Sequence, residues 1–212
     1  RGTHGVSSLM LSTLVLSNEN RLFAFCTKGS SHLFRRGRMS QEKRVMIMEE
    51  FESIIKDIVE NSEVLKMKEY RQHADTSCFD HCYMASYYCY ILCKKFKLDY
   101  KSCARAAMLH DFYLYDWRVK DISHKWHAFT HPKKALEKAL SIFDLNDREK
   151  DIIINHMWPV TIKLPRTKEA FILTLVDKYC ATYETVSYTL KQLKKKPSWQ
   201  YAYLMLWLVI RK

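Results

Sequence analysis

Glycine and proline are scarce in this chain, each occurring four times in 212 residues. Sandwiches and barrels need turn residues about every 8–12 positions, so the scarcity argues against an all-β fold. No segment alternates convincingly between polar and apolar residues as a strand would. The sequence also lacks an internal period and low-complexity runs, which excludes repeat arrays and collagen-like chains.

The cysteines lack the spacing of common metal or redox motifs. There are seven of them, and no two form a C-x-x-C pair, which disfavours a zinc knuckle. The odd number also disfavours a complete disulfide scaffold. Cys78, Cys82, Cys89 and Cys93 repeat at helical spacing instead. We interpret them as reduced, small apolar residues of a cytoplasmic protein.

Acidic residues are the minority charge: 23 of them face 35 basic residues, for a formal net charge of +12. Residues 1–38 contribute +5 of this, because Glu19 is their only acidic residue. The remaining surplus is compatible with a nucleic acid, an acidic surface or a phosphorylated small molecule as partner. No helix-turn-helix or other nucleic-acid-binding motif is visible, so we expect no specific nucleic-acid partner.

The two ends differ in character from the middle. The apolar run Val6–Leu16 is similar to part of a signal peptide but lacks a small-residue cleavage site. We expect residues 1–38 to be a non-native extension translated from DNA upstream of a start at Met39; a disordered basic tail is the alternative. Residues 197–212 form an apolar tail. Both apolar runs are too short to cross a bilayer, so no transmembrane span is expected.

The middle of the chain shows helical periodicity. Hydrophobic residues make up 48% of the sequence and aromatic residues 13%, enough to bury a core and to exclude wholesale disorder. We expect an all-α fold, a multi-helix bundle over residues 39–196. Helices are expected near residues 41–69, 78–96, 99–110, 130–142, 146–156 and 167–186, with a further one reaching 194.

Several of these helices carry an imidazole or a carboxylate within them or at one end. Asp177 directly follows the apolar run Phe171–Val176, where a carboxylate is costly unless something pairs with it. A metal ion would be such a partner, and nitrogen and carboxylate ligands together suit iron, manganese, zinc and similar ions. Each histidine alone is more typical of an ordinary core or surface residue; the set indicates a site. Its members are His81, His110, Asp111, His131, His156 and Asp177.

This order of residues resembles the HD superfamily of metal-dependent phosphohydrolases, whose all-α domain carries a His, a His-Asp pair and a final Asp. Those positions correspond to His81, His110-Asp111 and Asp177. The surrounding runs FDHCYMA, AMLHD and LVDK resemble the family's motifs. The resemblance covers about residues 70–185, and it implies an HD domain.

The resemblance further implies a centre for two divalent metal ions. His81, His110, Asp111 and Asp177 would hold the first ion, with Asp111 as the bridge to a second ion. His131 and His156 would complete the second site. This six-ligand arrangement is similar to bacterial symmetrical diadenosine tetraphosphate hydrolases and to a group of small bacterial HD proteins. Iron or manganese is expected, with zinc, cobalt, nickel or magnesium as alternatives.

Other residues are candidates for handling protons and substrate. If Asp111 bridges two metals it cannot also be a free base, so His73 and His127 are candidates for an outer-sphere acid or base. Many two-metal members carry a Gly and a Lys soon after the His-Asp pair, where this chain has Phe112–Tyr115. This departure makes cyclic-dinucleotide hydrolysis less expected. The candidates for binding the substrate are Arg71, Arg118, Lys178 and Trp158.

The expected function is an enzyme in which metal-activated water cleaves a phosphate ester or anhydride. The substrate would be a nucleotide or another small phosphorylated molecule. The main alternative is a regulatory HD protein that binds metal or nucleotide without turnover. A basic helical nucleic-acid-binding module and a di-iron oxygenase are further alternatives, and a homodimer is left open.

Overall fold

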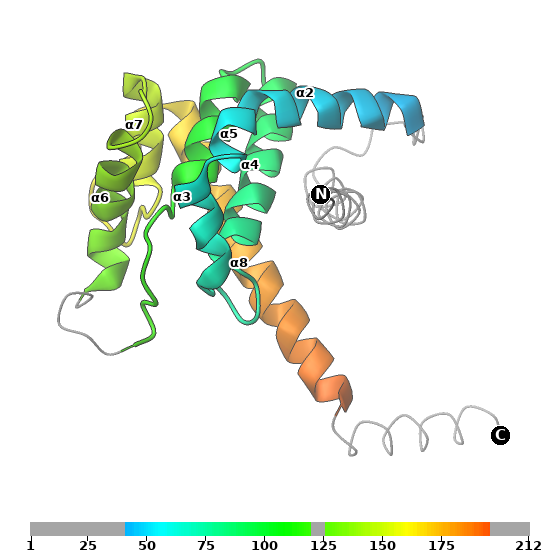
Figure 1. Ribbon diagram of the computed structural model, residues 1–212, viewed down its shortest axis with the longest axis vertical. Helices are drawn as coiled ribbons and strands as arrows, with labels where there is room; N and C mark the ends of the chain where they lie inside the picture. Colours follow the sequence, from blue (N-terminus) through cyan, green and yellow to red (C-terminus); the bar gives the residue numbers. More distant parts are fainter. Residues whose placement is uncertain (1–40, 120–125, 196–212) are drawn as a thin grey trace.

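The computed structural model describes residues 41–119 and 126–195 (Figure 1). Over these residues the fold is all-α, as predicted, and contains no strand. The predicted extension at residues 1–38 and the apolar tail at 197–212 lie outside the described residues. The helices are α2 (Gln41–Val59), α3 (Ser62–Leu65), the 3₁₀ helix η1 (Lys66–Glu69), α4 (Cys78–Lys95), α5 (Tyr100–Leu109), α6 (His127–Leu140), α7 (Asp147–Asn155) and α8 (Lys168–Lys195).

Three of the helices that carry the candidate site begin at polar capping residues. The Ser77 side chain accepts a hydrogen bond from the backbone N–H of Asp80 at the start of α4, and Asp99 caps α5 in the same way. At α7, Asn146 and Glu149 form a complete capping box. Each cap satisfies backbone donors that the first helical turn leaves unpaired, which fixes where the helix begins.

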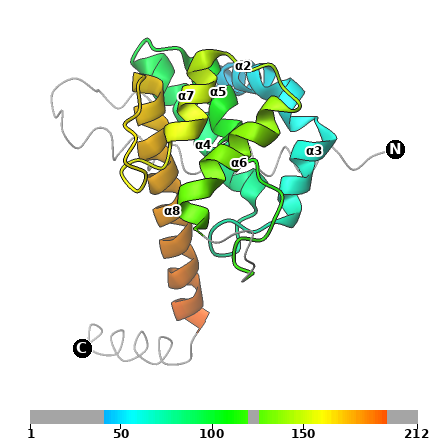
Figure 2. The same ribbon diagram turned by 90° about the vertical axis from the view of Figure 1, so that its left-hand side faces the viewer.

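Helix α4 is the centre of the bundle. Thirteen of its 18 residues are buried, so it is covered on nearly all sides. It packs mainly against α5 and α8 (Figures 1 and 2). The six cysteines in the described part of the chain are all buried, and none of them forms a disulfide. They fill the core as small apolar residues, in agreement with the sequence.

Two helix boundaries differ from those predicted. Helix α6 begins at His127, three residues before the predicted start, because the Trp126 carbonyl accepts hydrogen bonds from the N–H groups of Phe129 and Thr130. Pro132 therefore lies inside this helix instead of in its first turn. The two helices predicted after residue 167 form the single helix α8, since no glycine or proline interrupts residues 168–195.

A third difference lies at the beginning of the described chain. The single helix predicted over residues 41–69 is divided into α2, α3 and η1. The division follows from Asn61, whose side chain accepts a hydrogen bond from the backbone N–H of Glu63 and caps the short helix α3. Within the described residues, no helix is both long enough and apolar enough to span a membrane.

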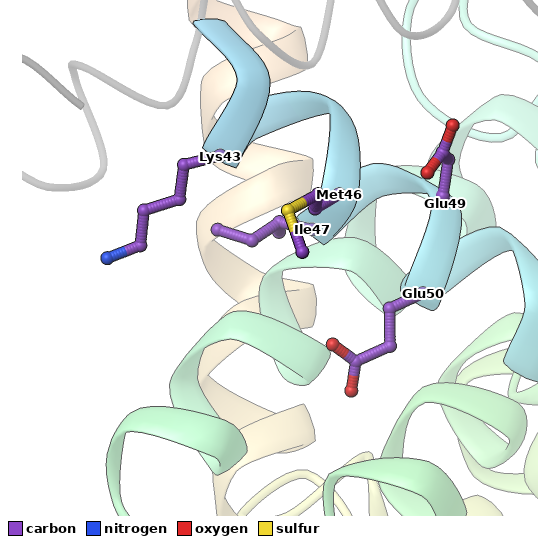
Figure 3. Close-up of a pocket in the computed structure, with 5 residues that line it drawn as sticks. All are labelled: Lys43, Met46, Ile47, Glu49 and Glu50. Carbon is purple, nitrogen blue, oxygen red and sulfur yellow. The ribbon is translucent and has the colours of Figure 1, made fainter. Parts of the chain in front are cut away.

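A hollow of about 500 Å³ lies along the N-terminal half of α2 (Figure 3). Its lining residue Glu50 pairs with Lys94 at the far end of α4. Lys94 and His81 are thirteen residues apart on α4, or about 20 Å along the helix axis. The hollow is therefore remote from the histidines described below. The lining residues are Lys43, Met46, Ile47, Glu49 and Glu50.

Candidate metal centre

Five helices bring the six predicted ligand residues into one buried cluster. None of the six is more than 8% exposed to solvent. His110 and His156 each occupy the C-cap position of a helix. The members are His81 from α4, His110 and Asp111 at the end of α5, His131 from α6, His156 at the end of α7, and Asp177 from α8.

The imidazoles of His81 and His110 lie close to the Asp177 carboxylate, and His110 also lies close to one of the two Asp111 oxygens, Oδ2. The Asp177 Oδ1 atom is 3.1 Å from His81 Nε2 and 3.7 Å from His110 Nε2. The Asp111 Oδ2 atom is 3.4 Å from His110 Nε2. We call His81, His110 and Asp177 the first ligand group; their ligand atoms all lie within 4.8 Å of one another.

The other oxygen of Asp111 faces a second pair of imidazoles. Asp111 Oδ1 is 3.2 Å from His131 Nε2 and 3.7 Å from His156 Nε2. The two Nε2 atoms are themselves 3.0 Å apart. We call Asp111, His131 and His156 the second ligand group. Asp111 therefore presents one carboxylate oxygen to each group, which is the geometry a bridging ligand needs.

In three of the four imidazoles, the nitrogen that faces away from the cluster contacts a backbone carbonyl. His110 Nδ1 lies 2.7 Å from the Ala107 carbonyl oxygen, and His156 Nδ1 lies 2.7 Å from that of Ile153. His131 Nδ1 is 2.9 Å from the His127 carbonyl oxygen. A carbonyl can only accept a hydrogen bond, so Nδ1 carries the proton and the Nε2 of a neutral ring presents a lone pair. The inward-facing atoms are thus suited to be ligands.

The arrangement of the inward-facing atoms is favourable when a cation lies among them and unfavourable when it does not. The Nε2 atoms of His131 and His156 face each other as two lone pairs at 3.0 Å, which is repulsive unless a positive charge lies with them. Asp111 Oδ1 and His110 Nε2 are buried and make no hydrogen bond. Ligands about 2.1 Å from one ion are about 3.0–3.4 Å apart, close to the spacings in both groups. These residues could therefore hold a metal ion.

In the absence of a metal, the surroundings favour a protonated His81 and a neutral His156. Burial by itself lowers the pKa of His81, but the carboxylates of Glu184 and Asp177 outweigh it and raise that pKa well above its usual value. Burial raises the pKa of Asp177, yet His110 and His81 hold it well below the normal range. Burial and two neighbouring imidazoles lower the pKa of His156 to about 3. Without a metal, a proton on His81 therefore balances part of the negative charge of Asp177 and Glu184.

The two candidate proton carriers lie beside the cluster. The His73 ring packs edge-on against His81, with the ring centroids 5.1 Å apart. The His127 ring stacks on the predicted ligand His131, with centroids 4.6 Å apart, and on Trp117, with centroids 5.4 Å apart. The Tyr115 hydroxyl lies 3.0 Å from His127 Nδ1. Each candidate thus contacts one ligand group.

The four predicted substrate-binding residues are placed differently from one another. Lys178 Nζ donates to the His156 carbonyl oxygen at 3.3 Å, so it is held against the backbone of a ligand residue. Arg118 is exposed and makes a two-pronged contact with the carboxylate of Asp116, at 2.9 Å to each oxygen. Arg71 is exposed, and its backbone pairs with Ser77. Trp158 packs against Phe171, with centroids 5.9 Å apart.

Two buried residues support the ligands but are absent from the prediction. Gln72 Nε2 donates to Asp111 Oδ2, and Gln72 Oε1 accepts from the Tyr113 hydroxyl. Both oxygens of Glu184 lie 3.1 Å from His81 Nδ1. The sequence does hold a signal for Glu184: it is the only acidic residue after Asp177 and follows it by seven positions, which places both on one face of a helix.

No protein-family model matches this chain, and neither a curated protein nor a solved structure shows significant similarity to it. The structure shows a helical bundle that buries a cluster of histidines and aspartates, and this cluster could bind metal.

Proposed function

We propose that the chain is a metal-dependent phosphohydrolase of the HD type. It would cleave a phosphate ester or anhydride of a nucleotide or another small phosphorylated molecule. The observation that carries the proposal is Asp111, whose two oxygens face two separate groups of inward-pointing imidazole nitrogens. Carboxylate-bridged pairs of metal ions are a recurrent device for phosphate hydrolysis.

Each ligand group would hold one divalent ion, with iron or manganese best suited to the mixture of nitrogen and carboxylate ligands. His81, His110 and Asp177 would bind the first ion, and His131 and His156 the second, with Asp111 shared between them. When bound, such ions lower the pKa of a water molecule and neutralise charge on a phosphoryl group.

The charge of the centre suits an anionic substrate. Three buried carboxylates, Asp111, Asp177 and Glu184, face the four imidazoles. Two divalent ions would exceed these three negative charges by one. The Lys178 ammonium lies against the backbone of His156 and adds a second positive charge. A phosphate group would therefore be attracted to the loaded centre, as the net charge of +7 over residues 39–212 (+12 for the whole chain minus +5 for residues 1–38) also favours.

His73 is suited to accept a proton. Burial, followed by the neighbouring His81, lowers its pKa below the usual value, so its imidazole is neutral and able to accept a proton near pH 7. In this proposal His73 accepts a proton beside the first group. His127, stacked on His131, serves the second group. The other candidates, Arg71, Arg118 and Trp158, would contact parts of the substrate away from the metals.

A second candidate function is metal or nucleotide binding for regulation, without turnover. The observation in its favour is the burial of the ligands: His81 and His110 are 0% exposed and Asp111 is 2% exposed. The segment directly after the His-Asp pair also begins with the buried aromatic residues Phe112 and Tyr113, and it holds no lysine. Asp177 and His131 are the most exposed members of the cluster, at 8% and 4%, so a substrate phosphate would find little of the centre open to solvent.

The test is to purify the protein without a metal-affinity tag under low oxygen and to measure metal per chain by elemental mass spectrometry. A panel of nucleotides is then assayed for phosphate release with Mn²⁺ or Fe²⁺. We expect about two ions per chain and hydrolysis of at least one nucleotide. Asp111→Ala should lose both ions, because it removes the shared ligand. Asp144→Ala, at an exposed aspartate outside the cluster, is the matched control and should keep them.

The outcomes separate the two functions. Two ions with no turnover of any phosphate ester would favour the regulatory function. No bound metal, even after reconstitution, would overturn the metal-dependent hydrolase and favour nucleotide-binding regulation or the nucleic-acid alternative. Metal content that is equal in Asp111→Ala and Asp144→Ala would show that the ions bind elsewhere.

A further inference from the structure

His81 is held differently from the other three imidazoles of the cluster. Where His110, His131 and His156 each place Nδ1 against a backbone carbonyl, His81 places it between the two oxygens of a carboxylate. That carboxylate belongs to Glu184, which is 8% exposed. A charged partner on the outer nitrogen makes an imidazole a stronger donor to a metal than a carbonyl partner does.

One face of α8 supplies both partners of His81. Asp177 and Glu184 are seven residues apart, about two helical turns, so their side chains leave the helix in nearly the same direction. Asp177 Oδ1 lies 3.1 Å from Nε2, and both Glu184 oxygens lie 3.1 Å from Nδ1. Helix α8 thus fixes both nitrogens of the His81 imidazole. This helix packs directly against α4, the helix that carries His81.

We propose that Glu184 is a positioning residue of the metal centre. It holds the proton of His81 on Nδ1, presents Nε2 to the first ion, and makes the first ligand group bind its ion more tightly than the second. This inference rests on the proposed metal-dependent function. It adds that the two ions load unequally and that Glu184 determines the difference.

The number of ligands also favours tighter binding of the first ion than of the second. The first group has His81, His110 and Asp177, and Asp111 Oδ2 lies 3.4 Å from His110. The second group has only two imidazoles besides Asp111 Oδ1. Four ligands, one of them reinforced by a buried carboxylate, should bind a divalent ion before three ligands whose two imidazoles are held by backbone carbonyls.

The experiment compares Glu184→Gln with the wild-type chain in a titration with Mn²⁺. The amide is nearly isosteric but removes the charge, so binding of the tighter ion should weaken roughly 10- to 100-fold while binding of the weaker ion changes little. Glu184→Asp keeps the charge on a shorter side chain and should recover part of the loss. Circular dichroism checks that each variant folds.

The matched control is Glu169→Gln. Glu169 lies on the same helix and is 2% exposed, yet it pairs with Arg148 and with the backbone N–H of Asp99 instead of a histidine. The Glu169→Gln variant should be less stable than the wild type but should bind Mn²⁺ with the same affinity. Nitrogen NMR of the imidazoles with Zn²⁺ gives a second readout: the Nδ1-protonated form of His81 should dominate in the wild type and decline in Glu184→Gln.

Equal Mn²⁺ affinities in Glu184→Gln and Glu169→Gln would overturn the inference, as would equal weakening of both ions. These results are distinguishable from failure of the proposed function. A wild-type protein that binds two ions unequally but hydrolyses no phosphate ester would contradict the phosphohydrolase and leave the role of Glu184 intact.

Discussion

At the scale of single residues, Asp111 is supported from several directions. Gln72 donates to its Oδ2 atom and in turn accepts from the Tyr113 hydroxyl, while Cys78 Sγ donates to the Asp111 backbone carbonyl at 3.2 Å. All of these groups are buried. Gln72 therefore fixes the plane of the carboxylate, and this plane decides whether its two oxygens can face two ligand groups.

Replacing Gln72 with Ala should destabilise the fold and loosen the centre. The substitution leaves Asp111 Oδ2 without its donor and the Tyr113 hydroxyl without its acceptor. A buried group that loses its hydrogen-bond partner costs about 1–3 kcal/mol, so the free energy of unfolding should fall by that amount. Urea unfolding of the metal-free protein measures it.

The control for this prediction is Gln41→Ala, in the exposed first turn of α2. It should change the unfolding free energy by less than about 0.5 kcal/mol. If both variants gave the same small change, the Gln72 bridge would contribute nothing to stability.

The residues that sequence reasoning found and missed differ in kind. His81, His110-Asp111 and Asp177 are recognisable because each lies within or next to a local run typical of a helix. The supports are not recognisable in this way: Glu184 is 103 positions from His81, and Gln72 is 39 from Asp111. Contacts over such separations depend on how helices pack, which helical periodicity does not specify.

At the scale of the helices, α8 divides into a packed part and a projecting part. Ala170, Leu173 and Val176 are buried against the bundle, whereas Val186 and Leu190 are each 50% exposed. Figures 1 and 2 both show the last turns of α8 extending past the other helices. Glu184 is the last buried residue along the described part of α8, so the contacts of the histidine–aspartate cluster with this helix come from its packed part.

Two proline substitutions on this helix should therefore have opposite outcomes. A proline in a helix interior removes a hydrogen bond and clashes with the preceding turn, at a cost of about 3 kcal/mol or more. Leu173→Pro should prevent folding and metal binding, because that turn is buried. Leu190→Pro should melt only the projecting turns, lower the unfolding free energy by about 1 kcal/mol or less, and leave metal per chain unchanged.

Circular dichroism and elemental mass spectrometry test this pair. Loss of metal in Leu190→Pro would show that the projecting turns support the centre.

The helix boundaries show why local patterns were only partly sufficient. Caps such as Asn146 are local signals, and α7 begins where its capping box predicts. The start of α6 depends on Trp126, whose left-handed backbone (φ of 67°) is unusual for a bulky residue and which no capping rule favours. Continuity of α8 past Val186 follows from packing and from the lack of a helix-breaking residue, whereas the sequence pattern weakens there.

At the scale of the whole molecule, the bundle is closed around a set of charges that must be balanced. Without metal, the carboxylates are balanced by protons on His81 and His110, whose pKa values are raised despite burial. Asp111 and Asp177 have lowered pKa values because imidazoles face them. Metal ions would replace those protons, so folding, proton binding and metal binding are coupled.

This coupling predicts opposite pH dependences for the two forms of the protein. His81 and His110 bind protons more tightly in the folded protein than in the unfolded chain. Their contribution to the free energy of unfolding is therefore complete below the histidine pKa of the unfolded chain, about 6.5. It is lost as the pH rises through the raised folded pKa values. The metal-free protein, kept with a chelator, should therefore lose stability as the pH rises above about 6.5, by up to about 1.4 kcal/mol per pH unit for each proton released. On the acid side, the contributions of Asp111 and Asp177 are lost only below about pH 3.8.

Saturating Mn²⁺ should reverse the trend above pH 6.5, since metal competes with these protons and binds more tightly as they leave. Urea unfolding at several pH values, with chelator and with Mn²⁺, measures both curves. His81→Gln removes one of the two titrating groups, so its metal-free curve should be flatter than that of the wild type. A metal-free wild-type curve that stays level or rises above pH 6.5 would mean that His81 and His110 are neutral in the folded protein. In that case the buried carboxylates must be balanced by other groups.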